Sequence, residues 1–245
     1  MPAVFVHGVP ETERIWDALR ANLTRDDVVA LTLPGFGRPL PEGFGATKDE
    51  YAAWLVGQLE DIGQPVDLVG HDWGGGLAMR LVSVRPDLVR TWVIDTGALA
   101  DPDYVWHQFA QVWQTPGDGE AFMDTWLASG PADRAAMFTA EGAPPETADT
   151  LAAAFDRTMA DAILALYRSA TKVHHDWGPD FTAIPKPGLV IVPSADPFLN
   201  AAQARRSAER AGARVEPLDG IAHWWMLSEP ARCARLLEEF WASAA

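Results

Sequence analysis

The stretch Val66-Asp-Leu-Val-Gly-His-Asp-Trp-Gly-Gly-Gly76 decides the fold of this chain. A short apolar strand, Val66 to Val69, runs into a glycine-rich turn, and a helix from Leu77 to Val84 follows. Because glycine permits a turn too tight for side chains, the turn pushes Asp72 out above the sheet. This is the layout of a nucleophile elbow, with aspartate where serine usually stands.

A simpler interpretation of Asp72 stays open at this point. Aspartate is a good N-cap residue, so Asp72 could merely cap the helix after the turn. The positive end of the same helix also favours an ionised carboxylate, which attacks an electrophilic carbon without a base to activate it. The remaining motifs favour the nucleophile.

Strand and helix patterns alternate on both sides of this turn. Short apolar runs predict strands at Ala3–Val6, Val28–Leu33, Val66–Val69, Thr91–Ile94, Gly188–Val192 and Arg214–Leu218. Helical spacing predicts helices from about Tyr51 to Ile62, Leu77 to Val84 and Pro230 to Ala242. The alternation predicts an α/β fold, a mostly parallel sheet flanked by helices.

The pattern changes between about Gly97 and Phe181, where it is helical with no convincing strand. An all-helical segment between two halves of a parallel sheet predicts a cap over the strand ends. We therefore expect a core domain of residues 1–96 and 182–245 and a cap domain of residues 97–181.

Two further polar residues follow predicted strands. Asp196 comes after the strand that ends at Val192, and His223 comes after the strand that ends at Leu218. Open α/β sheets place their sites at these strand ends. Either residue alone could be a turn former or a core residue. The order nucleophile, acid, histidine is that of the α/β-hydrolase triad, so the sequence predicts the α/β-hydrolase fold.

The loop His7-Gly-Val-Pro10 follows the first strand. In this architecture that loop contributes one backbone N–H to an oxyanion hole, here Val9, and the N–H of Trp73 is the other. Taken alone, the loop is better explained as an ordinary strand-exit turn. Its place relative to the elbow favours the oxyanion hole.

Five motifs together carry a resemblance to a known family: His7-Gly-Val-Pro-Glu11, Pro34-Gly-Phe-Gly37, Gly70-His-Asp-Trp-Gly-Gly75, Tyr167-Arg168 and Ala222-His-Trp224. They resemble the α/β-hydrolase-fold epoxide hydrolases, which are close relatives of the haloalkane dehalogenases. The resemblance covers nearly the whole chain and is weakest in the cap. The chain begins at what resembles the third core strand of that family, so we expect the usual first two strands to be absent.

The resemblance implies a covalent mechanism. Asp72 would displace a leaving group from carbon, and His223, oriented by Asp196, would activate the water that hydrolyses the ester. An epoxide oxygen needs a proton donor, and Tyr167 falls where the family carries a cap tyrosine. The family's second tyrosine position is matched by Val112, so Tyr104 or His107 would have to substitute.

A haloalkane dehalogenase with the same triad is the alternative. A halide needs N–H donors, and Trp73 suits that role, although Val9 stands where many dehalogenases carry asparagine. A second indole would come from the cap, where the candidates are Trp106, Trp113, Trp126 and Trp177. Fluoroacetate dehalogenases place arginines near the elbow, where this chain has Trp73 and Gly76, so a small anionic acid is disfavoured. We expect the substrate to be bound by His7, Pro10, Trp106, Trp113 and Trp224.

Other classes of function fit less well. A ligand-binding receptor or scaffold on this fold often loses the water-activating pair, and a conventional esterase or lipase needs serine or cysteine at position 72. The adjacent His174 and His175 point in different directions on a helix, so no metal is expected. No cofactor is expected either.

Composition restricts the partners. A formal net charge of -15 repels phosphates and anionic lipid, so nucleic acid and membrane surfaces are poor partners. We expect a small apolar epoxide or haloalkane and water as the partners, and a monomer or homodimer. The single cysteine, Cys233, forms no intrachain disulfide and is expected to be a packing residue. The apolar run from Ala3 to Val6 has no basic flank, so we expect no signal peptide and a cytoplasmic protein.

Overall fold

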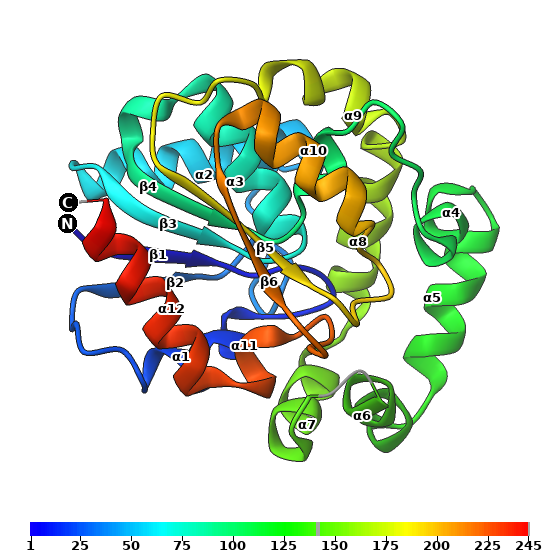
Figure 1. Cartoon of the computed structure of the whole chain (residues 1–245). Coiled ribbons are helices and arrows are strands. Elements are labelled where there is room, and N and C mark those ends of the chain that lie inside the picture. Colours follow the sequence, from blue (N-terminus) through cyan, green and yellow to red (C-terminus); the bar gives the residue numbers. More distant parts are fainter. Residues whose placement is uncertain (141–142, 245) are drawn as a thin grey trace.

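The computed structural model describes residues 1–140 and 143–244. These residues form one sheet of six strands in the order β2-β1-β3-β4-β5-β6, and every neighbouring pair is parallel (Figure 1). The strands are β1 (Ala3–Val6), β2 (Val28–Leu31), β3 (Val66–Gly70), β4 (Val89–Ile94), β5 (Gly188–Pro193) and β6 (Arg214–Leu218). The predicted fold class is confirmed.

Two apolar cores cover the two faces of the sheet (Figure 1). Helices α2 (Lys48–Ile62), α3 (Trp73–Val84) and α10 (Ala201–Ala211) pack on one face. The other face is covered by α1 (Asp17–Arg20), α11 (Trp225–Ser228) and α12 (Pro230–Ser243). Because side chains alternate along a strand, neighbouring residues contribute to different cores: Val4 belongs to the first and Phe5 to the second. Cys233 is buried in the second core, as expected for a packing residue.

Between β4 and β5 the described residues form only helices and loops, which we call the helical insertion. It contains α4 (Gln108–Gln114), α5 (Asp118–Ala128), α6 (Pro131–Ala140), α7 (Pro145–Ala154), α8 (Arg157–Ser169) and α9 (Val173–Asp176). Two short 3-10 helices, η3 (Gly97–Ala100) and η4 (Gly178–Asp180), also lie in the insertion. Two others precede it, η1 (Glu13–Trp16) and η2 (Pro86–Leu88). In Figure 1 the insertion extends beyond the ends of β5 and β6, with α4 and α5 outermost. The proposed division into core and cap remains a prediction.

Several element boundaries differ from the sequence prediction, and the largest shift is at α3. Helix α3 begins at Trp73 and not at Leu77, because the run Gly74-Gly-Gly76 is helical. Strand β2 ends at Leu31, two residues early. None of the helices in the described ranges is long and apolar enough to cross a membrane.

The glycines of the elbow are required by close backbone contact. A Cβ atom on Gly74 would lie 2.2 Å from the carbonyl oxygen of Val6, and one on Gly70 would lie 2.3 Å from the carbonyl oxygen of Gly74. Because the opposing atoms are backbone, no side-chain rotation relieves these contacts. Helix α3 therefore approaches β1 and β3 closely enough to place Asp72 at the end of the sheet.

We predict opposite effects for two glycine substitutions. Gly74→Ala should lower the free energy of unfolding by about 3 kcal/mol, because the new methyl group forces α3 away from β1. Gly57→Ala, on helix α2 with open space around it, should raise that free energy by about 0.5–1 kcal/mol. Urea denaturation of both variants tests the prediction. Similar free energies for the two would contradict the role assigned to the elbow glycines.

Candidate active site

Asp72 sits in a strained turn between β3 and α3. Its backbone angles are φ 48° and ψ -119°, a conformation that a non-glycine residue rarely adopts and that costs roughly 1–3 kcal/mol. Two hydrogen bonds hold the turn: the Asp72 N–H donates to Oδ1 of Asp95 (2.9 Å), and the Thr96 hydroxyl donates to the Asp72 carbonyl (3.0 Å).

The Asp72 carboxylate does not cap helix α3, so the N-cap interpretation is wrong. Its Oδ1 instead accepts the backbone N–H of Val9 at 2.9 Å. The loop after β1 and the elbow after β3 meet because these strands are neighbours with their carboxyl ends together. The next backbone N–H after Asp72, that of Trp73, starts α3.

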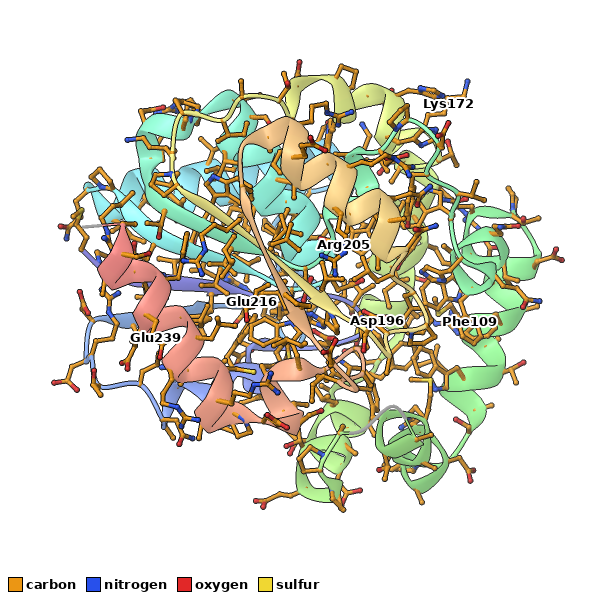
Figure 2. All side chains as sticks on the ribbon, in the orientation of Figure 1. Phe109, Lys172, Asp196, Arg205, Glu216 and Glu239 are labelled. Carbon is orange, nitrogen blue, oxygen red and sulfur yellow. The ribbon has the colours of Figure 1, made fainter. Side chains whose placement is uncertain are left out.

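His223 and Asp196 form a pair close to Asp72. The Nδ1 atom of His223 lies 2.9 Å from Oδ2 of Asp196, and Oδ1 of Asp196 accepts the N–H of Phe198 at 2.8 Å. An Nδ1–H donated to the carboxylate leaves Nε2 free to accept a proton. Figure 2 shows Asp196 at the end of β5, beside α4, which carries Phe109.

Charge and burial set the pKa values of these three groups. Burial raises the pKa of Asp72 to about 6, although the charges of His223 and His71 and the Val9 N–H oppose this rise. Burial and the His71 charge lower the pKa of His223, but Asp196 and Asp72 outweigh them and raise it above 6.5. Burial acts to raise the pKa of Asp196, and the His223 charge lowers it overall.

A second buried network lies directly behind the elbow. Nδ1 of His71 lies 2.5 Å from Oδ2 of Asp95, and its Nε2 lies 3.1 Å from Oε1 of Glu11. The indole N–H of Trp224 donates to Glu11, and that of Trp225 donates to Asp95 at 2.6 Å. Burial alone would lower the pKa of His71, but the two carboxylates raise it well above its ordinary value. Burial acts to raise the pKa of Glu11, and His71 lowers it to about 2.

Sequence reasoning assigned no role to Glu11, His71 or Asp95. Asp95 directly follows a predicted strand, the same signal that identified Asp196 and His223, and His71 is adjacent to the elbow aspartate. The pairing of the three was not visible, because they come from three separate strand exits. The network places an imidazolium between two carboxylates next to Asp72.

Two cavities meet at the elbow, and Asp72, His107, Phe198 and His223 line both. The small cavity, about 30 Å³, has polar groups in its lining, including Asp95, Thr96, Tyr104 and Asp196. A volume of this size holds one or two water molecules. The apolar cavity, about 130 Å³, is bounded by Val9, Pro10, Phe109, Trp113, Phe122, Trp126, Met137, Tyr167 and Trp224.

The two predicted tyrosines lie on different cavities. Tyr167, on α8, lines the apolar cavity, and Tyr104 lines the small one. Burial first, and then the negative charge of Asp72, raises the pKa of Tyr167 well above 10. The same two causes raise the pKa of Tyr104. Burial, with the charge of His223, lowers the pKa of His107 to about 4, so its imidazole is neutral at pH 7. The two phenols therefore keep their protons at neutral pH, whereas the neutral His107 offers only a hydrogen-bonding N–H.

Four of the five predicted substrate-binding residues line a cavity. They are Pro10, Trp113 and Trp224 in the apolar cavity and Trp106 in the small one. The prediction for His7 is wrong. Its ring is fully buried, Nδ1 contacts the Gly8 carbonyl at 2.8 Å, and Nε2 accepts the Leu33 N–H at 3.1 Å. His7 instead joins the loop after β1 to the segment that follows β2.

Two indole N–H groups near the elbow are buried without a hydrogen-bond partner in the described structure, those of Trp73 and Trp113. Both rings pack on Tyr167, with centroid distances of 5.5 and 4.8 Å. The other two candidate donors with a buried indole are engaged. Trp106 donates to the Ala170 carbonyl and Trp177 to Asp49.

One group of metal-ligating residue types is compact among the described residues. Atoms of Glu11, His71 and His223 lie within 4.8 Å of one another. Both nitrogens of His71 face carboxylates, and its raised pKa keeps both protonated. A protonated nitrogen has no lone pair for a metal. This geometry is therefore that of an ion-pair network.

The geometry agrees with the comparisons with known proteins. The family model described as "Alpha/beta hydrolase family" matches residues 3–236. The chain belongs to this family. Among curated relatives, the lipase LipV of Mycobacterium tuberculosis is 38% identical over 96 residues, which cover 39% of this chain and 36% of that protein. Epoxide hydrolase 2 of Siraitia grosvenorii is 37% identical over 100 residues, which cover 38% and 31%. The matched parts thus span about a third of the length of these relatives.

Solved structures support the same α/β-hydrolase fold. The epoxide hydrolase VrEH1 of Vigna radiata superposes with a TM-score of 0.78 at 19% identity, covering 99% of this chain and 91% of that one. A loop variant of the haloalkane dehalogenase DbeA from Bradyrhizobium elkanii superposes with a TM-score of 0.76 at 20% identity, covering 100% and 91%. At this level of identity the likeness concerns the fold alone.

We predict that the buried network stabilises this α/β hydrolase. Asp95→Asn should lower the free energy of unfolding by about 3 kcal/mol, because it removes one of the two charges that compensate the buried His71. Asp61→Asn, on the exposed side of α2, should leave that free energy nearly unchanged. Urea denaturation near pH 7 measures both. Equal stability of Asp95→Asn and Asp61→Asn would show that His71 is not a buried cation.

Proposed function

We propose that this protein hydrolyses epoxides to diols through a covalent ester on Asp72. The observation that carries the proposal is the position of the Asp72 carboxylate. It lies at the junction of two cavities, with Oδ1 held by the Val9 N–H and a protonated tyrosine in the lining of each cavity. A carboxylate that faces a cavity and makes no capping bond is free to attack carbon.

The first half-reaction uses the second carboxylate oxygen. Because Oδ1 already accepts the Val9 N–H, Oδ2 attacks the epoxide carbon and the C–O bond of the ring breaks. The ring oxygen leaves as an alkoxide and takes a proton from Tyr167 or from Tyr104. The pKa of each phenol is raised, so both carry this proton at neutral pH.

The second half-reaction uses His223. Its free Nε2 removes a proton from water, and the resulting hydroxide attacks the carbonyl carbon of the Asp72 ester. Negative charge then develops on Oδ1, where the N–H groups of Val9 and Trp73 stabilise it. Asp196 holds the imidazolium that forms. The ester C–O bond then breaks, and the departing diol oxygen takes the proton of the His223 imidazolium. The proton that the attacking hydroxide leaves on the Asp72 carboxyl returns to the tyrosinate, which restores both side chains. The small cavity beside His223 is the size that this water requires.

The helical insertion would serve as a cap over this site. Tyr167 of α8 and Trp113 of α4 come from the insertion, whereas Asp72, Val9 and His223 come from the loops of the sheet. Both sets line the same apolar cavity. Residues 97–181 would thus complete a site that the sheet alone leaves open.

Haloalkane dehalogenation is a second candidate, because of the two unpartnered indole N–H groups. Trp73 and Trp113, whose rings both pack on Tyr167, would donate these N–H groups to a departing halide. To decide between the two reactions, the purified enzyme is incubated with styrene oxide and with 1-bromobutane. Diol without bromide supports the epoxide proposal, and bromide without diol overturns it.

Variants of the triad should separate the two half-reactions. His223→Gln should accumulate the ester and gain the mass of the epoxide, because alkylation proceeds while hydrolysis is lost. Asp72→Ala should lose turnover and gain no mass. Intact-protein mass spectrometry after incubation with styrene oxide measures both. If His223→Gln gains no mass from epoxide or haloalkane, covalent catalysis is wrong.

The pH dependence of alkylation should reflect the raised pKa of Asp72. Only the ionised carboxylate attacks, so the alkylation rate should fall as the pH drops below about 6. Because the His223 charge lowers the pKa of Asp72, removing it in His223→Gln should shift this acid limb to higher pH. Stopped-flow alkylation rates of the wild type and the variant test this. If the alkylation rate of both proteins falls only near pH 4, the pKa of Asp72 is not raised by its surroundings, which would contradict this account.

A further inference from the structure

A large hollow lies on the outer surface of the helical insertion, between α5 and α6. Its volume is about 610 Å³, and the lining used in this argument consists of Asp118, Ala121, Phe122, Trp126, Asp133 and Met137. Figure 1 places α5 and α6 at the outer edge of the insertion, away from the sheet. The hollow is therefore reached from solvent without crossing the core.

Three side chains separate this hollow from the apolar cavity. Phe122, Trp126 and Met137 line both spaces, and each is half-buried. Met137 is flexible, and Phe122 and Trp126 pack against each other with a ring-centroid distance of 6.0 Å. One continuous apolar path thus leads from Asp72, through the apolar cavity and past this wall, to the outer hollow.

The inner part of this path is too small for a long substrate. At about 130 Å³ the apolar cavity is slightly smaller than an engineered protein cavity of about 150 Å³ that binds benzene. A substituent of more than about six carbons must therefore pass the wall. The outer hollow is large enough to receive the remainder.

The outer hollow is acidic. Asp118 and Asp133 lie in its lining, and both residues are exposed. Arg168 is neutralised by Glu120 at 2.7 Å, whereas Arg134 donates to the carbonyls of Trp126 and Ser129 in the lining and keeps its charge, so two carboxylates face one arginine at this mouth. With a net charge of -15 on the whole chain, this mouth repels a carboxylate.

We propose that the substrate is an epoxide on a long, unbranched, uncharged alkyl chain, which runs past Phe122, Trp126 and Met137 into the hollow between α5 and α6. This inference rests on the proposed function, because it places the epoxide at Asp72. It adds the substrate class, and it identifies the wall between the two spaces as the element that determines chain length.

A series of terminal epoxides from 1,2-epoxybutane to 1,2-epoxydodecane tests the chain length. Each methylene buried in the apolar cavity should raise kcat/KM about fourfold, and each one in the half-open outer hollow about twofold. The rise should therefore continue beyond a six-carbon substituent. A plateau or a fall at that length would overturn the proposal.

A matched pair of variants tests the path. Ala121→Trp fills the outer hollow, and Ala153→Trp places the same side chain on an exposed position of α7 outside it. Ala121→Trp should remove the advantage of 1,2-epoxydodecane over 1,2-epoxyhexane, whereas Ala153→Trp should retain it. If both variants retain the advantage, the chain does not lie in this hollow.

The charge preference has its own test. At low ionic strength, 9,10-epoxydecanoate should show at least tenfold lower kcat/KM than 1,2-epoxydecane. The difference should shrink in the double variant Asp118→Asn with Asp133→Asn, and also in high salt. Equal kcat/KM values for the acid and the alkyl epoxide would contradict an acidic mouth.

Binding of unreactive chains separates this inference from the proposed function. Decanamide should bind at least tenfold more tightly than butanamide by calorimetry, and Ala121→Trp should abolish the difference. If the long amide binds better but no epoxide is opened, the hollow stands and epoxide hydrolysis fails. If short epoxides are opened but neither amides nor epoxides show the length dependence, epoxide hydrolysis is supported and the long-chain substrate class is wrong.

Discussion

A half-buried carboxylate at a tight backbone turn is the constraint on which the rest of this structure depends. Asp72 has no direct ion pair in the described residues, and a single backbone N–H, that of Val9, binds its Oδ1. Burial raises its pKa to about 6, so it remains ionised at neutral pH but is poorly solvated. The strained turn that exposes it is possible because Gly70 and Gly74 let helix α3 approach β1 and β3.

The charges around Asp72 form two layers with different tasks. His223 and Asp196 border the small cavity together with Asp72, and in the proposed mechanism they activate water there. Glu11, His71 and Asp95 lie behind the elbow, where Asp95 also binds the Asp72 N–H. The second layer thus couples the conformation of the elbow to a buried cation, whose charge lowers the pKa of Asp72. Fold stability and the reactivity of the carboxylate depend on the same few contacts.

Much of this arrangement was predictable from local sequence patterns. Buried parallel strands appear as apolar runs, and Asp72, Asp196 and His223 each follow such a run, so the sequence places them at one edge of the sheet. The start of α3 was mispredicted, because three glycines suggest a turn unless close backbone packing requires them in a helix. His7 was misassigned, because a polar residue at a strand end gives no sign of whether it faces a cavity or the core. The pairing of Glu11, His71 and Asp95 depends on contacts between three strand exits, which no local pattern encodes.

The origin of the oxygen atoms in the product tests the covalent role of Asp72 most directly. In a single turnover in water labelled with the heavy oxygen isotope, an ester on Asp72 is hydrolysed by attack on its carbonyl carbon. The diol should then carry an unlabelled oxygen from Asp72, and the peptide that contains Asp72 should gain one heavy oxygen atom. A diol that takes its new oxygen from the labelled water in this first turnover, with an unlabelled Asp72 peptide, would contradict the account.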